Sequence, residues 1–152
     1  MKPEKSLRSR ALDWLSRGEY SRVQLQQKLA KYSDDIDAIN DLLEQLQQAG
    51  WQSDERFAEA LIHSKSRRLG NRRLAQYLQQ KGIDSECFQD ALPSKEHQID
   101  NALQVLIKKF KVFETDAQVQ LKYKRFLAYR GFDMDVILAA IKMWQQDIEK
   151  TD

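Results

Sequence analysis

The sequence predicts an all-α protein made of three tandem three-helix repeats, with a period of about 49 residues, that form an elongated, curved helical array. Three observations predict this fold: apolar residues recur at helical spacing, the sign of the charge alternates along the chain, and the whole pattern is repeated. Only five glycines and two prolines occur among the 152 residues, which disfavours a turn-rich β fold.

The repeat is visible first in the charges, although the chain as a whole carries only +2. Six successive blocks, residues 1–31, 32–55, 56–81, 82–107, 108–131 and 132–152, carry +5, −7, +6, −4, +5 and −3. An offset of 49 then aligns Leu29 with Leu78 and Leu127, and Gly82 with Gly131. This period differs from that of tetratricopeptide and ankyrin repeats, which is about 34 and 33 residues.

The first repeat is predicted over residues 7–50. Ser21 and Gln24 form a capping box at the start of a helix whose apolar residues, Leu25 and Leu29, are four apart. After a polar break, a stripe of apolar residues predicts a further helix that Gly50 ends: Ile36, Ile39, Leu42, Leu43 and Leu46.

The second repeat is predicted over residues 53–92. Its first helix follows from the apolar stripe Phe57, Ala58, Leu61 and Ile62. Its second helix follows the break at Gly70, with Asn71 as the cap. Gly82 ends that helix in the left-handed conformation, and Asp84 caps the next one.

The third repeat is predicted over residues 97–148. Two apolar stripes indicate its first two helices: Leu103, Leu106, Ile107 and Phe110, then Val119, Tyr123, Phe126 and Leu127. Gly131 ends the second of these, and a last helix runs from about Asp135 to Asp147. Nine helices are therefore expected.

The basic residues fall mainly on the first and second helices of each repeat, so successive repeats would present a stripe of positive charge. Such a stripe can replace the counterions along a phosphate backbone. The candidate binding residues are Arg67, Arg68, Arg72, Arg73, Lys108, Lys109, Lys111, Lys122, Lys124, Arg125 and Arg130. The alternative is that these side chains only keep the helix faces solvated.

The sequence gives little sign of catalytic chemistry. His63 and His97 have no partner at metal-ligand spacing, and Cys87 adjoins an apolar stripe, where a buried role is expected. No glycine-rich motif that would cradle a nucleotide is present. We therefore expect no catalytic residue, no cofactor, no metal and no small-molecule substrate. Most aromatic residues are predicted to be core, including Trp14, Trp51, Phe57, Phe126 and Trp144, whereas Tyr20, Tyr32 and Tyr129 are freer to stack on bases.

The start of the sequence lacks the apolar segment of a signal peptide, and no window is apolar enough to span a membrane. A single cysteine fits a reducing compartment. A cytoplasmic protein that does not contact membranes is expected.

Three segments resemble the RecX family of bacterial regulatory proteins. They are SDERFAEALIHSKSRRLGNRRLAQYLQQKGID at 53–84, SRVQLQQKL at 21–29 and FLAYRGFD at 126–133, and the resemblance extends from about residue 7 to 141. Two positions, Gln24 and Tyr77, depart from the family pattern.

The resemblance implies a protein without enzymatic activity that restrains the RecA recombinase. Family members bind RecA and its filament on single-stranded DNA, limit filament growth, and lower strand exchange, ATP hydrolysis and coprotease activity. The expected partners are thus RecA, the RecA–DNA filament and single- or double-stranded DNA. Two alternatives stay open at this point: a helical nucleic-acid-binding module that acts alone, and a protein-interaction scaffold that does not act on RecA.

Overall fold

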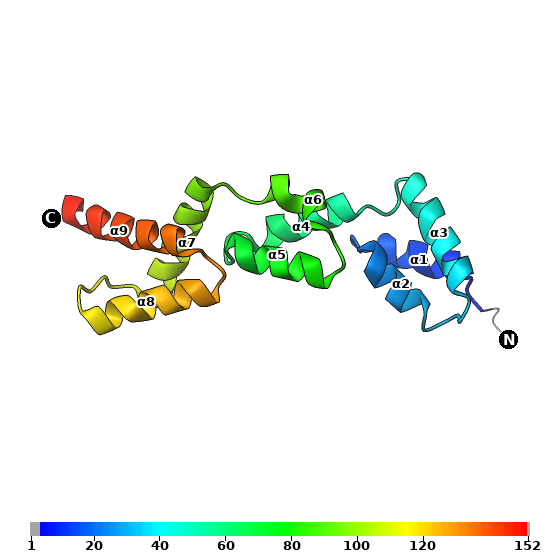
Figure 1. Cartoon of the computed structure of the whole chain (residues 1–152), viewed down its shortest axis with the longest axis horizontal. Coiled ribbons are helices and arrows are strands. Elements are labelled where there is room, and N and C mark those ends of the chain that lie inside the picture. The colour runs from blue at the N-terminus through cyan, green and yellow to red at the C-terminus, as the bar shows by residue number, and fades with distance from the viewer. Residues whose placement is uncertain (1–3, 152) are drawn as a thin grey trace. The chain divides into compact units, whose positions relative to one another are not determined.

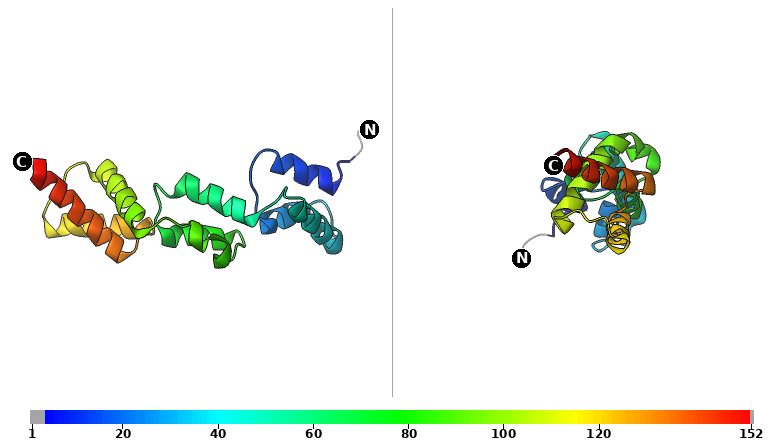
Figure 2. Two further views of the ribbon diagram at one scale, coloured as in Figure 1. Left: turned by 90° about the horizontal axis from the view of Figure 1, so that it is seen from above. Right: turned by 90° about the vertical axis from the view of Figure 1, so that its left-hand side faces the viewer.

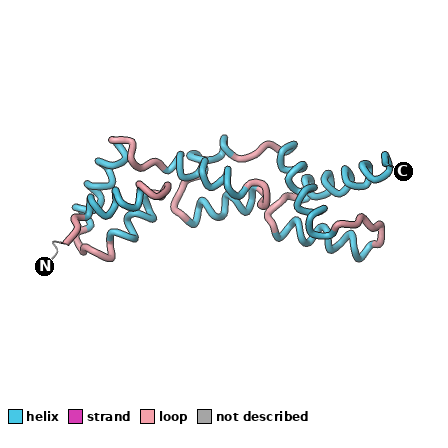
Figure 3. Tube along the Cα trace, turned by 180° about the vertical axis from the view of Figure 1, so that it is seen from behind, coloured by secondary structure: helices cyan, strands magenta, loops and turns pink. Residues whose placement is uncertain are grey.

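The computed structural model describes residues 4–151, and that part of the chain is all helical, with no strand (Figure 1, Figure 3). Three tandem three-helix repeats are present, which confirms the predicted fold class. The first repeat comprises α1 (Leu7–Leu15), α2 (Arg22–Leu29) and α3 (Ile36–Gln48). The second comprises α4 (Asp54–Lys65), α5 (Asn71–Gln80) and α6 (Ser85–Phe88), and a 3-10 turn at Gln89–Ala91 follows it. The third comprises α7 (Lys95–Phe110), α8 (Ala117–Tyr129) and α9 (Met134–Thr151). Within residues 4–151, none of these helices combines the length and the apolar character needed to cross a bilayer.

The chain divides into two compact units, and the division falls inside the second repeat. Unit 1 contains the described residues up to Ala60 together with Leu78–Asp90. Unit 2 contains Leu61–Tyr77 together with the described residues from Ala91 onward. Helices α4 and α5 therefore each contribute residues to both units.

The core of unit 1 is formed where α2 packs against α1 and α3. Its buried residues are Ala11, Leu25, Leu29, Ile39, Leu42, Leu43 and Leu46. Two caps fix the ends of these helices: Ser21 and Gln24 form the predicted capping box, and the Asp35 side chain accepts from the Ala38 N–H. Each fully buried leucine contributes about 1.5–3 kcal/mol to stability relative to an exposed one.

The core of unit 2 lies where α9 packs against α7 and α8 (Figure 2). Its buried residues are Ala102, Leu103, Leu106, Tyr123, Leu127, Phe132, Val136, Ile137, Ala140, Ile141 and Trp144. Tyr123 is fully buried, and its hydroxyl donates to the Val112 carbonyl at 2.9 Å and accepts from the Glu114 N–H at 3.1 Å. The loop between α7 and α8 is held to the core by these two hydrogen bonds.

A glycine turn joins the second repeat to the first, and we call this contact the first junction. The Ser21 hydroxyl donates to the Lys81 carbonyl at 2.8 Å, beside the start of α2. Gly82 has a φ of +79°, and a Cβ on it would lie 2.3 Å from a methyl carbon of Val23. The turn therefore needs glycine both for its backbone conformation and for its close approach to α2.

The same contact recurs 49 residues later, inside unit 2, and we call it the second junction. The Gly70 N–H donates to the Arg130 carbonyl at 2.9 Å, and the Arg72 N–H donates to the Gly131 carbonyl at 3.2 Å. Gly131 has a φ of +94°, and a Cβ on it would lie 2.3 Å from the Cβ of Arg73. The similar segments KGID at 81–84 and RGFD at 130–133 thus each pack one repeat against the second helix of the repeat before it.

Several sequence predictions need correction. Asn71 is the first residue of α5 rather than its cap: its amide donates to the Pro93 carbonyl at 2.9 Å, while the Arg73 N–H donates to Gly70. Asp84 occupies the cap position of α6, but its side chain makes no capping hydrogen bond. Ile36 and Trp51 are 65% and 57% exposed and lie outside the core. The last helix is also longer than predicted, because its apolar stripe continues to Ile148.

Candidate nucleic-acid interface

Four basic side chains of unit 2 surround one pocket, which we call the cationic pocket. Its volume is about 290 Å³, and it is lined by Arg68, Val105, Lys108, Lys109, Phe126 and Arg130. Arg68 follows α4, Lys108 and Lys109 lie in the last turn of α7, and Arg130 directly follows α8. Three segments that are far apart in the sequence therefore meet at this point.

The second junction holds the walls of the cationic pocket together. While the Arg130 carbonyl accepts from Gly70, the Arg130 guanidinium donates to the Arg68 carbonyl at 3.4 Å. The same guanidinium carbon lies 5.1 Å from the centre of the Phe126 ring, so the ring supports the charged group. We call the two apolar residues of its lining, Val105 and Phe126, the floor, and its four basic residues the rim.

The charge of this rim is not neutralised by nearby acids. Within residues 4–151, no carboxylate lies within 4.0 Å of the charged groups of Arg68, Lys108, Lys109 or Arg130. The two lysines are stabilised instead by the partial negative charge at the carboxyl end of α7. Four unneutralised cations around a low-dielectric floor attract an anion, and a phosphate group has the charge to fit this rim.

The other predicted residues divide into two groups. Arg67, Arg72 and Arg73 lie on the segment of the second junction, but Arg72 has a structural role there: its guanidinium donates to the Phe132 carbonyl at 3.2 Å and lies 4.0 Å from the Asp133 carboxylate. Arg73 lies 4.9 Å from the centre of the Tyr129 ring. The remaining residues do not line the cationic pocket: Lys111 ends α7 with a φ of +64°, and α8 carries Lys122, Lys124 and Arg125.

Sequence reasoning missed the floor of the pocket. Phe126 was expected in the core, yet its ring is only partly buried and underlies Arg130. The sequence spacing indicates this arrangement, because Phe126 and Arg130 are four residues apart, as are Val105 and Lys109. Side chains four apart on a helix share one face.

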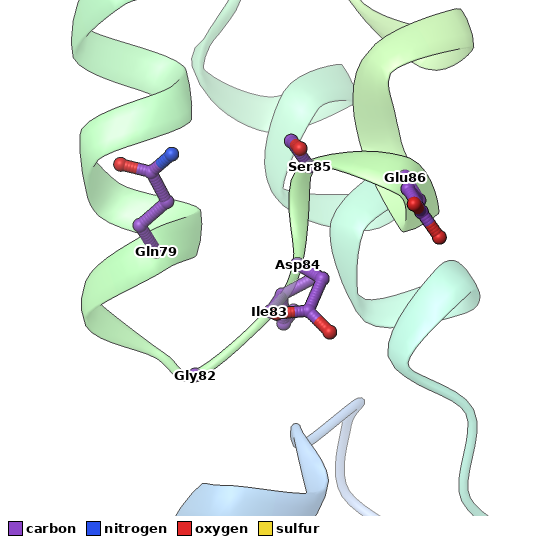
Figure 4. Close-up of a pocket in the computed structure, with 6 residues that line it drawn as sticks. All are labelled: Gln79, Gly82, Ile83, Asp84, Ser85 and Glu86. Carbon is purple, nitrogen blue, oxygen red and sulfur yellow. The ribbon is translucent and has the colours of Figure 1, made fainter.

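Unit 1 has a second pocket, of about 520 Å³, beside the first junction (Figure 4). It is lined by Gln79, Gly82, Ile83, Asp84, Ser85 and Glu86, and we call it the acidic pocket. The charge of its two carboxylates would repel a phosphate backbone. Cys87 lies next to this segment and is partly buried, rather than buried as expected. Burial and, to a lesser extent, the carboxylates of Asp54, Glu55, Asp84 and Glu86 raise the pKa of its thiol, which disfavours the nucleophilic thiolate.

Comparison with known proteins gives consistent results over nearly the whole chain. Residues 53–92 match the family model of the second three-helix domain of RecX, and residues 96–141 match that of the third. A regulatory protein RecX of Neisseria meningitidis (serogroup C) is 46% identical over 150 residues, which are 98% of each chain. The regulatory protein RecX of Chromobacterium violaceum is 43% identical and covers 88% of this chain and 87% of its own.

Solved structures share the fold. The crystal structure of RecX from Lactobacillus salivarius superposes with a TM-score of 0.82 at 22% identity, over 92% of this chain and 95% of that one. A second crystal structure of a regulatory protein RecX has a TM-score of 0.76 at 24% identity, over 86% of this chain and 68% of that one.

Proposed function

Because this chain belongs to the RecX family of regulatory proteins, we propose that it is a negative modulator of the RecA recombinase. It binds RecA and the RecA filament on single-stranded DNA, and it thereby limits filament growth, strand exchange, ATP hydrolysis and coprotease activity. It acts by binding and has no catalytic activity of its own. Its partners are RecA, the RecA–DNA filament and DNA.

One observation carries the DNA-binding part of this proposal: Arg68, Lys108, Lys109 and Arg130 share a pocket with no acidic partner among the described residues. Solvated cations that only confer solubility need not converge on one place. Phosphate binding explains why the basic side chains are clustered, because each contact with a phosphate releases condensed counterions from the strand. We assign the remaining predicted residues to secondary contacts with DNA or with RecA: Arg67, Arg72, Arg73, Lys111, Lys122, Lys124 and Arg125.

The decisive variant is the double charge reversal Lys108→Glu and Lys109→Glu. Both side chains are exposed and neither makes an ion pair within residues 4–151, so the fold should tolerate the change. Arg72 and Arg73 are less suitable targets, because both belong to the second junction. The matched control is Lys142→Glu with Lys150→Glu, which makes the same change in net charge on exposed positions of α9.

Two readouts separate the possible functions. Binding to a labelled single strand is measured over a range of salt concentrations, and RecA activity is measured as DNA-dependent ATP hydrolysis and cleavage of the LexA repressor. We expect the pocket variant to lower DNA affinity about tenfold or more and to reduce the salt slope by about 0.7 per lost phosphate contact. RecA inhibition should weaken in parallel, and the control variant should change neither readout by more than about twofold.

The outcomes also discriminate the alternatives. DNA binding without any effect on RecA, even at excess protein, would identify a nucleic-acid-binding module that acts alone. Negligible DNA binding at low salt, together with no effect on RecA, would identify an interaction scaffold. Equal effects of both double variants would mean that net charge, and not the cationic pocket, governs DNA binding.

A further inference from the structure

Exposed tyrosines in this protein are paired with cations. Among residues 4–151, the exposed large aromatic side chains are Tyr32, Trp51, Tyr77 and Tyr129, with exposed fractions of 53%, 57%, 36% and 73%. Each of the three tyrosines has a basic group near its ring: Arg10 at 3.8 Å, Lys65 at 5.2 Å and Arg73 at 4.9 Å from the ring centre. The described residues show no such cation for Trp51.

The three tyrosines are distributed one to a repeat, although Arg73, the cation beside Tyr129, belongs to the second repeat. Tyr32 comes three residues after α2, Tyr77 lies within α5, and Tyr129 is the last residue of α8. Each tyrosine is therefore in or just beyond the second helix of its repeat. Their alignment positions differ, because an offset of 49 aligns Tyr32 with Lys81, and Tyr129 with Gln80. The feature that the repeats share is an exposed tyrosine in or just beyond the last turn of the second helix.

The hydroxyl groups of these tyrosines do not hold the fold together, although the Tyr32 ring lies 6.3 Å from that of Trp14. Tyr123, by contrast, is buried in the core of unit 2 and uses its hydroxyl in two hydrogen bonds. No hydrogen bond of the hydroxyls of Tyr32, Tyr77 or Tyr129 is found within residues 4–151. Burial of an aromatic ring stabilises a protein only when water is excluded from it, and Tyr129 is about three-quarters exposed.

We propose that Tyr32, Tyr77 and Tyr129 are base-stacking residues for single-stranded nucleic acid, and that Arg10, Lys65 and Arg73 bind the adjoining phosphates. An exposed ring offers a flat apolar face to an unpaired base of any identity, and a neighbouring cation suits the backbone of the same nucleotide. A duplex keeps its base faces stacked inside, so this arrangement selects single strands. The inference rests on the DNA-binding part of the proposed function and makes its ligand specific.

Tyr129 is the strongest of the three sites because it adjoins the cationic pocket. The next residue, Arg130, lines that pocket, and so does Phe126, one turn earlier on α8. A strand with a phosphate on the pocket rim would bring a neighbouring base within reach of the Tyr129 ring. Phosphate binding and stacking would then act on consecutive parts of one strand.

The experiment compares two labelled strands of equal length, one of oligo-thymidine and one of abasic sugar phosphate, on the full chain. The substitution is Tyr129→Leu, which keeps an apolar side chain but removes the ring; Tyr129→Phe keeps the ring, and Trp51→Leu removes an exposed ring that has no cation. We expect Tyr129→Leu to weaken oligo-thymidine binding about fivefold or more and to leave abasic binding and the salt slope unchanged. Tyr129→Phe and Trp51→Leu should bind like the unmodified chain.

Three results would overturn the inference. They are equal binding of the two strands by the unmodified chain, an equal loss for both strands in Tyr129→Leu, and no single-strand binding at all. Helix content and melting temperature, measured by circular dichroism, verify that each variant is folded. RecA-dependent ATP hydrolysis is recorded in the same experiment. Inhibition of RecA without a preference for the strand with bases rejects the stacking inference and leaves the proposed function standing. A preference for that strand without inhibition of RecA supports stacking and rejects the proposed action on RecA.

Discussion

The two junctions of this protein use the same backbone turn but border pockets of opposite charge. At the first junction, the turn at Gly82 adjoins a pocket with Asp84 and Glu86. At the second, the turn at Gly131 adjoins a pocket rimmed by four cations. The glycine turn is therefore common to both junctions, whereas the side chains around it set the charge of each pocket.

Both units contain ion pairs, among them Arg72 with Asp133 and Lys95 with Asp135 in unit 2, but the cations of the cationic pocket stand apart. In unit 1, Lys5, Arg22 and Arg56 form ion pairs with Asp13, Glu44 and Glu19. In unit 2, the cations of the cationic pocket have no such partner within residues 4–151. The positive charge of residues 1–31 is therefore a weaker guide to a binding surface than the count alone suggests.

The largest expected effect is that of Gly131→Ala. The new methyl group would meet the Arg73 Cβ at 2.3 Å and the Arg73 nitrogen at 2.6 Å, at a φ of +94°. We expect a loss of about 3–5 kcal/mol in the free energy of unfolding, from the left-handed conformation and from overpacking. Urea denaturation followed by circular dichroism measures it.

Gly50→Ala is the control for this prediction. Gly50 has a similar φ of +81° but no atom within 4 Å of the added Cβ. It should lose only the conformational part, about 1–2 kcal/mol. Equal losses in the two variants would show that close approach at the second junction does not matter.

A smaller effect is expected for Ser21→Ala at the first junction. Ser21 is fully buried and both caps α2 and donates to the Lys81 carbonyl. Losing the cap and leaving that carbonyl without its donor should cost about 2 kcal/mol. Ser94→Ala, which removes the cap of α7 at an exposed position, should cost about half as much in the same denaturation experiment. The junction bond would be negligible if the two variants were equally stable.

Exchanging the charge of the acidic pocket should have a smaller effect still. Asp84→Lys with Glu86→Lys places cations beside the first junction, and both positions are exposed. We expect DNA binding about threefold tighter at low salt, with the gain lost near 0.2 M salt because the new contacts are electrostatic. A labelled-strand titration measures this change. Unchanged affinity at low salt would indicate that charge near this turn is out of reach of DNA.

The smallest effect concerns Asp135, which stands 49 residues after Glu86. A hydrogen bond from Lys95, at 3.1 Å, and one from the Val136 N–H lower the pKa of its carboxyl group. A lowered pKa in the folded state means that the carboxylate stabilises the fold above the unfolded pKa, and that this stability is lost as pH falls through the folded pKa. The melting temperature of Asp135→Asn should therefore lie slightly below that of the unmodified chain near pH 6 and converge with it near pH 2.

Much of the fold follows from the sequence because its signals are local. The capping box at Ser21 and Gln24 and the glycine turn at Gly82 each depend on residues a few positions apart. Asn71 was misplaced for a tertiary reason: Gly70 lies against Gly131, where a Cβ would come within 2.3 Å of the carbonyl oxygen, so glycine stands just before the helix and α5 starts at Asn71, one residue earlier than the capping preference of Asn suggests.

The site was only partly predictable. Arg68, Lys108, Lys109 and Arg130 were all among the candidate residues, but their convergence depends on three segments that only the fold brings together. Periodicity also placed Ile36 and Trp51 in the core, although Ile36 is the first residue of α3 and Trp51 lies in the loop between α3 and α4, where both side chains are exposed. The hydrophobic pattern identifies the apolar face of a helix. It does not determine whether the residues at the ends of that face are covered by a neighbouring element.

Helix α5 has a junction at each of its ends: Gly70 and Arg73 belong to the second, and Lys81 and Gly82 follow its last residue at the first. A helix of about ten residues is marginal in water on its own, so its persistence depends on both attachments. Fraying of its first turn would therefore loosen the second junction within unit 2. A ligand seated at the cationic pocket would hold the Arg130 carbonyl in place and slow exchange of the Gly70 amide proton that it accepts, a change that hydrogen exchange records without any change in average structure.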